Sequence, residues 1–261
     1  WWTQSVVSRN FNPEMGFISR NDVIGTTPGI IRYFRGGKLP LKKWIRSFDP
    51  GIDIQFYHQA STGRLIERQL IFYPFYLNFQ NAGYLGYGIS SIFQSITDTF
   101  YPLGIAIGSG NYKYIQHTIT ASTDPSKKIN IKGSVNTGTY FNGKLATGGI
   151  QAFFAPIPHI SLGCQYNRNQ FREVGNDKIT KTVDLYSIEG RFALNPRLQV
   201  SSFFQKNSEN DLQNINIRFS WEYQPLSFFY IVFNRNDYVN ALLYRQKEDQ
   251  LIVKASLLKQ F

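Results

Sequence analysis

The chain has 261 residues, of which 42% are hydrophobic and 16% aromatic. This length suits one large β domain, or at most two ordinary domains. No stretch approaches the ~18 consecutive apolar residues that a membrane-spanning helix requires. Cys164 is the only cysteine, which excludes an internal disulfide and a cysteine-based metal cluster.

The formal net charge of +11 comes from 28 Lys and Arg against 17 Asp and Glu. A nucleic-acid-binding protein usually gathers such charge into one stripe. Here the basic residues are spread through expected strands and turns, so we expect no nucleic-acid partner. Residues facing a wet interior, or meeting anionic lipid headgroups, explain the charge better.

The first half of the chain reads as a series of strands. We expect them at 1–9, 22–35, 45–59, 65–77, 83–98, 112–123 and 128–141. Trp1 enters its strand directly, with neither Met nor a leader, so we expect further strands or a domain upstream. The apolar parity switches within 65–77, and also within the later segment 179–194, which suggests a bulge or a misplaced boundary in each.

The second half alternates more cleanly, with expected strands at 144–155, 160–172, 179–194, 197–207, 212–223, 228–238 and 250–261. Ile217, Phe219 and Trp221 share one parity, and Arg218 and Glu222 share the other. Such a period of two predicts a strand with one apolar and one wet face. Cys164 falls on the apolar parity of its strand, where we expect a small buried residue.

The links between these strands sort into two kinds. Short links, most of them with Pro, are expected in the periplasm at 36–44, 124–127, 156–159 and 224–227. Mostly longer, polar links are expected outside at 9–21, 60–64, 99–111, 168–178, 207–211 and 234–249. Short turns at one end and long loops at the other are typical of outer-membrane barrels.

The sequence therefore predicts an all-β fold, a transmembrane antiparallel up-and-down β-barrel of about fourteen visible strands that occupies 1–261 as one domain. The final strand, with Leu257 and Phe261 on its apolar parity, looks like the signal read by the barrel assembly machinery. This places the chain in the bacterial outer membrane, with a periplasmic C-terminus. Membrane lipids, lipopolysaccharide and other outer-membrane proteins are the expected partners.

Four charged residues on the polar parity of clean strands are candidates to face the lumen: Lys132, Arg218, Glu222 and Lys254. They either form a salt-bridged filling of a solid barrel, which we favour, or line a path for anionic solute. His117 shares parity with Ile115 and Ile119, but the sequence supplies no Ser and carboxylate pattern to make it catalytic. We therefore expect no catalytic residue, no metal site and no cofactor.

Several stretches resemble a family of Bacteroidota outer-membrane proteins that carry a periplasmic carbohydrate-binding-module-9-like domain followed by a C-terminal barrel domain of unknown function. The matching pieces are FNPEMGFISR at 11–20, IRFSWEYQPLSFFYIVFNRN at 217–236 and LIVKASLLKQF at 251–261. The first contains a candidate extracellular loop motif of Asn12, Pro13, Glu14, Gly16 and Phe17. The chain matches the barrel part, so any sugar-binding role of the family falls outside it.

Three functions from different classes follow. The first is a membrane anchor and solute passage that works with a periplasmic domain. The second is a non-conducting subunit of a larger outer-membrane complex for secretion, insertion or glycan uptake. The third is a barrel enzyme acting on lipid or peptide, which we rank well below the others and do not expect.

Overall fold

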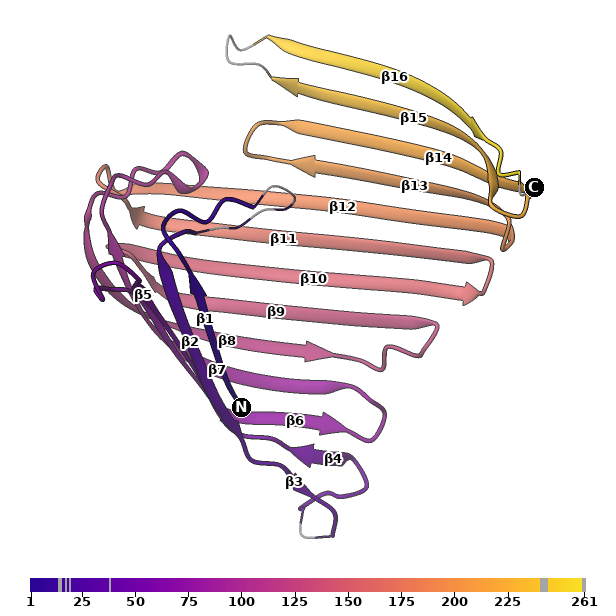
Figure 1. The fold of residues 1–261 in the computed structure, drawn as a ribbon. Helices are drawn as coiled ribbons and strands as arrows, with labels where there is room; N and C mark the ends of the chain where they lie inside the picture. The colour runs from indigo at the N-terminus through magenta and orange to yellow at the C-terminus, as the bar shows by residue number, and fades with distance from the viewer. Residues whose placement is uncertain (14–15, 17, 19, 38, 240–243, 260–261) are drawn as a thin grey trace. The chain divides into compact units, whose positions relative to one another are not determined.

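A computed structural model describes residues 1–13, 16, 18, 20–37, 39–239 and 244–259. The described chain consists of strands, turns and one short 3₁₀ helix, η1 (Pro102–Gly104) (Figure 1). Its strands are β1 (Trp2–Val7), β2 (Val23–Ile31), β3 (Phe34–Arg35), β4 (Ile45–Phe48), β5 (Gly51–Gln59), β6 (Leu65–Phe79), β7 (Tyr84–Ile96), β8 (Gly110–Ser122), β9 (Ile129–Tyr140), β10 (Gly143–Ile157), β11 (Ile160–Val174), β12 (Ile179–Asn195), β13 (Leu198–Asn207), β14 (Leu212–Gln224), β15 (Ser227–Val239) and β16 (Arg245–Ser256). Within this part, no helix has the length and apolarity needed to cross a membrane.

The strands follow one another as an up-and-down meander. The pairing order is β1-β2-β5-β6-β7-β8-β9-β10-β11-β12-β13-β14-β15-β16, and β3 and β4 lie off this path. Neighbouring strands pair in antiparallel register, as β1 does with β2 and β14 with β15. The expected all-β, antiparallel up-and-down fold is therefore confirmed, and so are the fourteen strands of the main path.

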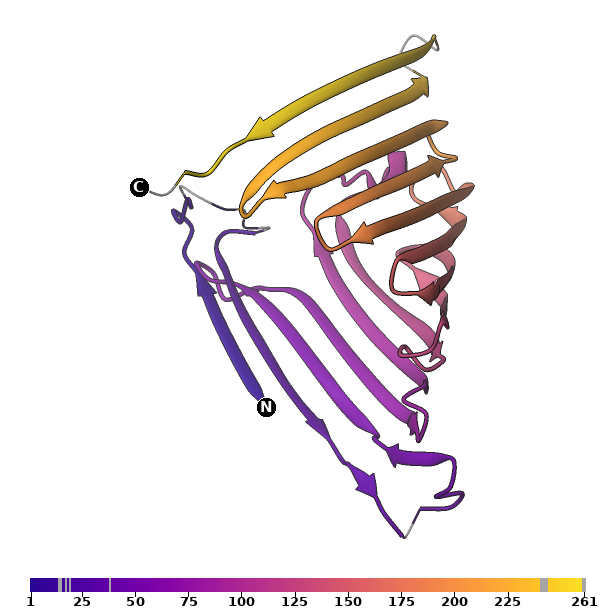
Figure 2. The same cartoon turned by 90° about the vertical axis from the view of Figure 1, so that its right-hand side faces the viewer.

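The chain divides into two compact units. Unit 1 comprises 1–121, 134–147 and 170–181, and unit 2 comprises 122–133, 148–169 and 182–261. In unit 1, β1 and β2 lie side by side, and the short β3–β4 pair follows them (Figure 2). In unit 2, the hairpins of β13 to β16 lie in sequence order (Figure 1).

Two expected strands are each interrupted once. The expected strand 22–35 separates into β2 and β3, and 45–59 separates into β4 and β5. The second break falls at Asp49-Pro50, where proline has no backbone N–H to donate to a ladder. The carbonyl of Pro50 instead accepts a 2.9 Å hydrogen bond from the Arg32 amide. The bulge suggested for 65–77 is present between Phe72 and Phe75.

Two of the expected long loops are wrong. Residues 168–174 belong to β11, leaving only a tight turn before β12, and the expected loop 234–249 lies largely within β15 and β16. Their polar side chains are satisfied by cross-strand partners, so the chain stays extended. Arg235 on β15, for example, faces Asp249 on β16 and bonds it through two 2.7 Å contacts.

The last strand also ends earlier than expected, at Ser256 rather than at residue 261. The hydroxyl of Tyr223 donates a 3.0 Å hydrogen bond to the Ser256 carbonyl, and the Leu258 amide donates one of the same length to the Ser227 hydroxyl. These side-chain partners replace the ladder at this end. Leu257 is exposed beyond the strand, and Phe261 lies outside the described residues.

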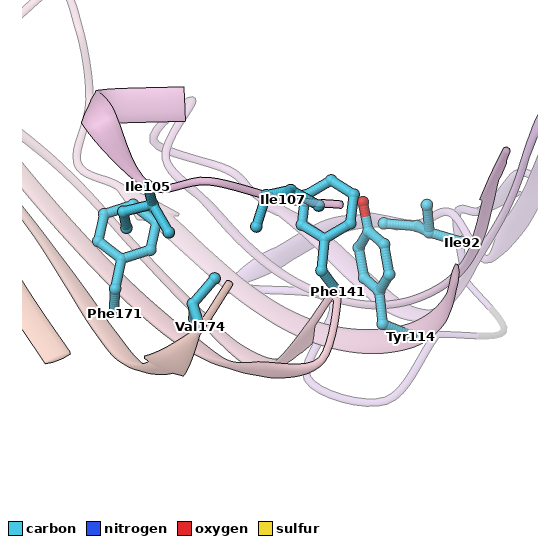
Figure 3. Packing of buried hydrophobic residues seen from close by; sticks show 7 residues of the cluster. All are labelled: Ile92, Ile105, Ile107, Tyr114, Phe141, Phe171 and Val174. Carbon is cyan, nitrogen blue, oxygen red and sulfur yellow. The ribbon is translucent and has the colours of Figure 1, made fainter. Parts of the chain in front are cut away.

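A cluster of buried hydrophobic residues in unit 1 forms where the link between β7 and β8 folds back over the sheet. Ile105 and Ile107 on this link are 1% and 0% exposed. Figure 3 shows them above Phe171, Val174 and Phe141. The link was expected to be an outer loop, and its apolar residues fasten it to one sheet face because their burial removes apolar surface from water.

Candidate membrane-facing surface and polar face

Each unit has one sheet face that carries exposed apolar side chains, which we call its apolar face. In unit 1, Ile30, Ile52, Phe72 and Ile89 lie opposite one another on four successive strands. Residues directly opposite in an antiparallel ladder project to the same side of the sheet. Ile30 is 69% exposed and Phe72 47%, so no second layer of the described chain covers this row.

Unit 2 repeats the arrangement over five strands. Phe192, Val200, Phe219, Ile231 and Val253 form one in-register row from β12 to β16. Val253 at the edge is 60% exposed. A large exposed apolar surface marks contact with a membrane or a partner protein.

Cys164 corrects one sequence-based prediction. It was expected to be a buried small residue, but it is exposed. Ile160 and Leu162, which share its parity on β11, are 40% and 41% exposed. Parity therefore identified the face correctly, while the inference of burial assumed a covering layer that the described chain does not supply.

The opposite side of each sheet is its polar face. In unit 2 the register places Ser220, Tyr230 and Lys254 in one row, so Lys254 shares a face with Arg218 and Glu222, which lie two residues either side of Ser220. The structure thus brings three of the four candidate lumen residues to one face. Lys132, the fourth, lies on β9.

The candidate lumen residues do not form the favoured salt-bridged filling. Among the described residues, neither Lys132, Arg218 nor Lys254 takes part in an ion pair, and Glu222 accepts a 2.9 Å hydrogen bond from the Leu226 amide. Glu222 therefore holds the β14–β15 turn, where Leu226 has a positive φ of 60°. The amide needs such an acceptor because a tight turn leaves it without a ladder partner.

The polar face of unit 1 is lined by tyrosines over glycines. A Cβ added to Gly86 would lie 2.7 Å from the ring of Tyr76, and one added to Gly88 would lie 3.2 Å from the ring of Tyr73. Glycine at both positions therefore leaves the room that the rings occupy. A depression of about 290 Å³ beside them includes Gln116 and Asn136, whose side chains share a 3.0 Å hydrogen bond.

His117 lies on the apolar face, as its parity predicted. Its Nδ1 is 2.8 Å from the Tyr87 hydroxyl, and the two rings stack with an angle of 10° between their planes. A catalytic histidine is ordinarily oriented by a carboxylate. The described residues give His117 a phenol instead, and nowhere do they gather three potential metal ligands.

The candidate loop motif falls in the link between β1 and β2. Asn12, Pro13 and Gly16 are described there, while Glu14 and Phe17 lie outside the described residues. At the end of this link Asp22 accepts hydrogen bonds from the Ser61 hydroxyl and amide and from Gln59. The Ser61 hydroxyl bond, followed by the Gln59 bond, lowers the pKa of Asp22 and ties this link to the β5–β6 turn.

A group that sequence reasoning missed lies on the apolar face of unit 1. Arg68, Lys113, Lys144 and Arg172 line one open depression of about 820 Å³, which we call the basic groove. They come from β6, β8, β10 and β11. Their apolar parity within each strand was the available signal, but only the register shows that they meet.

No family model, no curated protein and no solved structure matches the chain.

Proposed function

We propose that the chain is the β-barrel domain of an integral outer-membrane protein, where it anchors a periplasmic domain and encloses a polar passage for solute. The observation that carries this proposal is the uncovered apolar face, which recurs in both units as in-register rows backed by polar faces. Alternating apolar-out and polar-in residues are the arrangement by which a β-sheet spans a bilayer. The resemblance to Bacteroidota outer-membrane proteins supports the periplasmic domain.

A bilayer places one further demand on this fold. An unpaired backbone group in the hydrocarbon core costs several kcal/mol, so a spanning sheet has no free edge. β1 and β16 begin and end the pairing order. In the membrane the backbone groups on the free edge of each of these strands must therefore be satisfied.

A fluorescence experiment tests the apolar face directly. Trp1, Trp2 and Trp44 are replaced by Phe, which leaves Trp221 as the only tryptophan. After reconstitution into vesicles, lipids brominated along their acyl chains should quench Trp221, and aqueous acrylamide should not.

The matched control moves the probe to the other face of the same strand. In a Trp221→Phe background, Arg218→Trp should respond to acrylamide instead, because Arg218 is exposed and residues an odd number of positions apart in a strand project to opposite faces. If acrylamide quenches Trp221 and brominated lipid does not, the membrane assignment fails.

One observation favours a non-conducting subunit as the second candidate. The link between β7 and β8 packs over the face of unit 1 that carries Tyr114, the same face as Gln116 (Figure 3). A covered face narrows any passage beside it. Swelling of vesicles in sugars of graded size separates the two functions, since an open passage admits small sugars and a filled barrel admits none.

A further inference from the structure

We propose that the basic groove binds the phosphate headgroup of an anionic membrane lipid. This inference rests on the proposed function, because it places the groove at the margin of the lipid-facing surface. Arg68, Lys113, Lys144 and Arg172 supply its charge. No Asp or Glu is among the described residues that line it.

The groove lacks internal compensation for its charge. The buried Nε of Arg68 has no hydrogen-bond partner within the described residues. Lys113 and Lys144 form no ion pair within the same part of the chain, and Arg172 donates a 3.0 Å hydrogen bond to the neutral Gln170 amide oxygen. Like charges gathered on one face are unfavourable unless an anion compensates them.

The width of the groove fits lipid headgroups. The strands from β6 to β11 are consecutive neighbours, and at about 4.8 Å per strand spacing their five intervals span about 24 Å. Within that width, the long Lys and Arg side chains on different strands can extend towards one another and hold their charges at headgroup level. The groove can therefore engage more than one phosphate, from one lipid or from neighbours.

The apolar surroundings favour a lipid over a soluble phosphate. Ile115 lines the groove and is 51% exposed, and Ile119 continues the same face of β8. On β9, Val135 lies on that face two residues before Thr137, and on β6 Phe72 lies four residues beyond Arg68. A phosphate in the groove would thus leave an attached acyl chain against apolar strands, whereas a soluble phosphate gains nothing from them.

Electron spin resonance with spin-labelled lipids tests the proposal on the full chain in phosphatidylcholine vesicles. The immobilised fraction of spin-labelled phosphatidylglycerol should exceed that of labelled phosphatidylcholine. A cation near the membrane surface contributes about fivefold to the affinity for anionic lipid. Lys113→Gln with Lys144→Gln should therefore lower the preference by up to about 25-fold at low salt, which is that factor applied twice.

The matched control is Lys132→Gln with Lys254→Gln. It removes two lysines outside the groove that have no ion-pair partner in the described part of the chain, and it should preserve the preference. The wild-type chain provides a measurement that needs no variant. Raising the salt from roughly 0.05 to 0.5 M should collapse the preference by screening. A preference that survives both the groove substitutions and the salt would overturn the inference.

Two further results separate the inference from the proposed function. Immobilised lipid without headgroup preference would refute the basic groove alone, while the absence of any immobilised lipid would refute the membrane assignment itself. Inorganic phosphate is the third arm. If millimolar phosphate abolishes the preference when chloride of equal ionic strength does not, the groove is a site for soluble phosphate and the lipid assignment is wrong.

Discussion

The two units treat charge on the apolar face in opposite ways. In unit 2, Arg235 pairs with Asp249, and Arg245 pairs with Asp237, through contacts of 2.7 and 2.6 Å. In unit 1, no carboxylate is found among the described residues that line the basic groove with its four cations. The same kind of surface is thus neutralised from within in one unit and left for an external anion in the other.

This difference indicates which part of a lipid-facing sheet can select one lipid headgroup over another. Paired charges present little net field to the membrane, because each guanidinium is balanced by a carboxylate across the strand. Unpaired cations attract anionic lipid and gain strength from each neighbour. A uniform apolar face can therefore carry one site that selects a headgroup and another that ignores it.

The largest effect should come from the feature that both units share. Phe219→Arg places a charge at the centre of the unit 2 row, which costs ~2–4 kcal/mol at a midplane lipid-facing site. Ser220→Arg projects to the polar face and should be tolerated. The folded fraction in vesicles, read from heat-modifiable gel migration, should fall for Phe219→Arg alone.

A corresponding pair of substitutions in unit 1 tests whether its apolar face also contacts lipid. Phe72→Arg should impair folding into vesicles more than Gln69→Arg, whose side chain lies on the polar face. Equal tolerance of Phe72→Arg and Gln69→Arg would mean that unit 1 does not face lipid. The two units would then not share a lipid-facing surface.

The sequence predicted the faces better than the ends of the strands. Alternation at Ile217, Phe219 and Trp221 was sufficient to separate the two sides of β14, because a period of two is a local property. The loop expected at 234–249 was wrong because the Arg235 and Asp249 pair is a contact between strands. A hydropathy pattern reads such polar residues as loop.

The basic groove was beyond sequence reasoning for a related reason. Arg68 and Arg172 are far apart in the chain, and their meeting depends on the register of the strands between them. The bulge at Phe72 and Phe75 also reverses the parity of β6, which concealed the face on which Arg68 lies. Each residue alone reads as an ordinary solvated cation.

The next pair of substitutions removes carboxylates that pair with cations on the apolar face of unit 2, so that this face resembles the basic groove of unit 1. Asp237→Asn with Asp249→Asn removes the carboxylates nearest to Arg235 and Arg245, and Arg245 keeps a 3.7 Å contact with Asp211. Each freed cation should raise the preference for phosphatidylglycerol by up to about fivefold. Spin-labelled lipid measures the change, and an unaltered preference would show that charge pairing does not govern lipid selection here.

The reverse conversion supplies a carboxylate to unit 1. Thr137 lines the basic groove, and Thr137→Glu should lower the preference for phosphatidylglycerol, by about fivefold for one neutralised cation. Thr137→Gln is the matched control, since it has a similar size without the charge. A loss of preference in both variants would indicate obstruction of the groove rather than neutralisation.

The smallest effect concerns how unit 1 holds a carboxylate at its strand ends. Asp22 is bound by the neutral donors Ser61 and Gln59, which lower its pKa. Its contribution to stability is therefore fully present above the unfolded pKa of about 3.9 and is lost as the pH falls through the lower folded value. The Ser61 amide resonance, followed by NMR in micelles, should titrate with a midpoint below that of an ordinary aspartate.

Added salt and the substitution Asp22→Asn test whether uncharged partners hold the Asp22 carboxylate. Because its main partners are uncharged, added salt should move the midpoint little, whereas screening weakens interactions between exposed charges such as those that hold Asp249 in unit 2. In Asp22→Asn the Ser61 resonance should no longer titrate in this range. A midpoint at or above the ordinary value, or one that shifts strongly with salt, would mean that charge holds Asp22 as well, and unit 1 would then resemble unit 2 at this point.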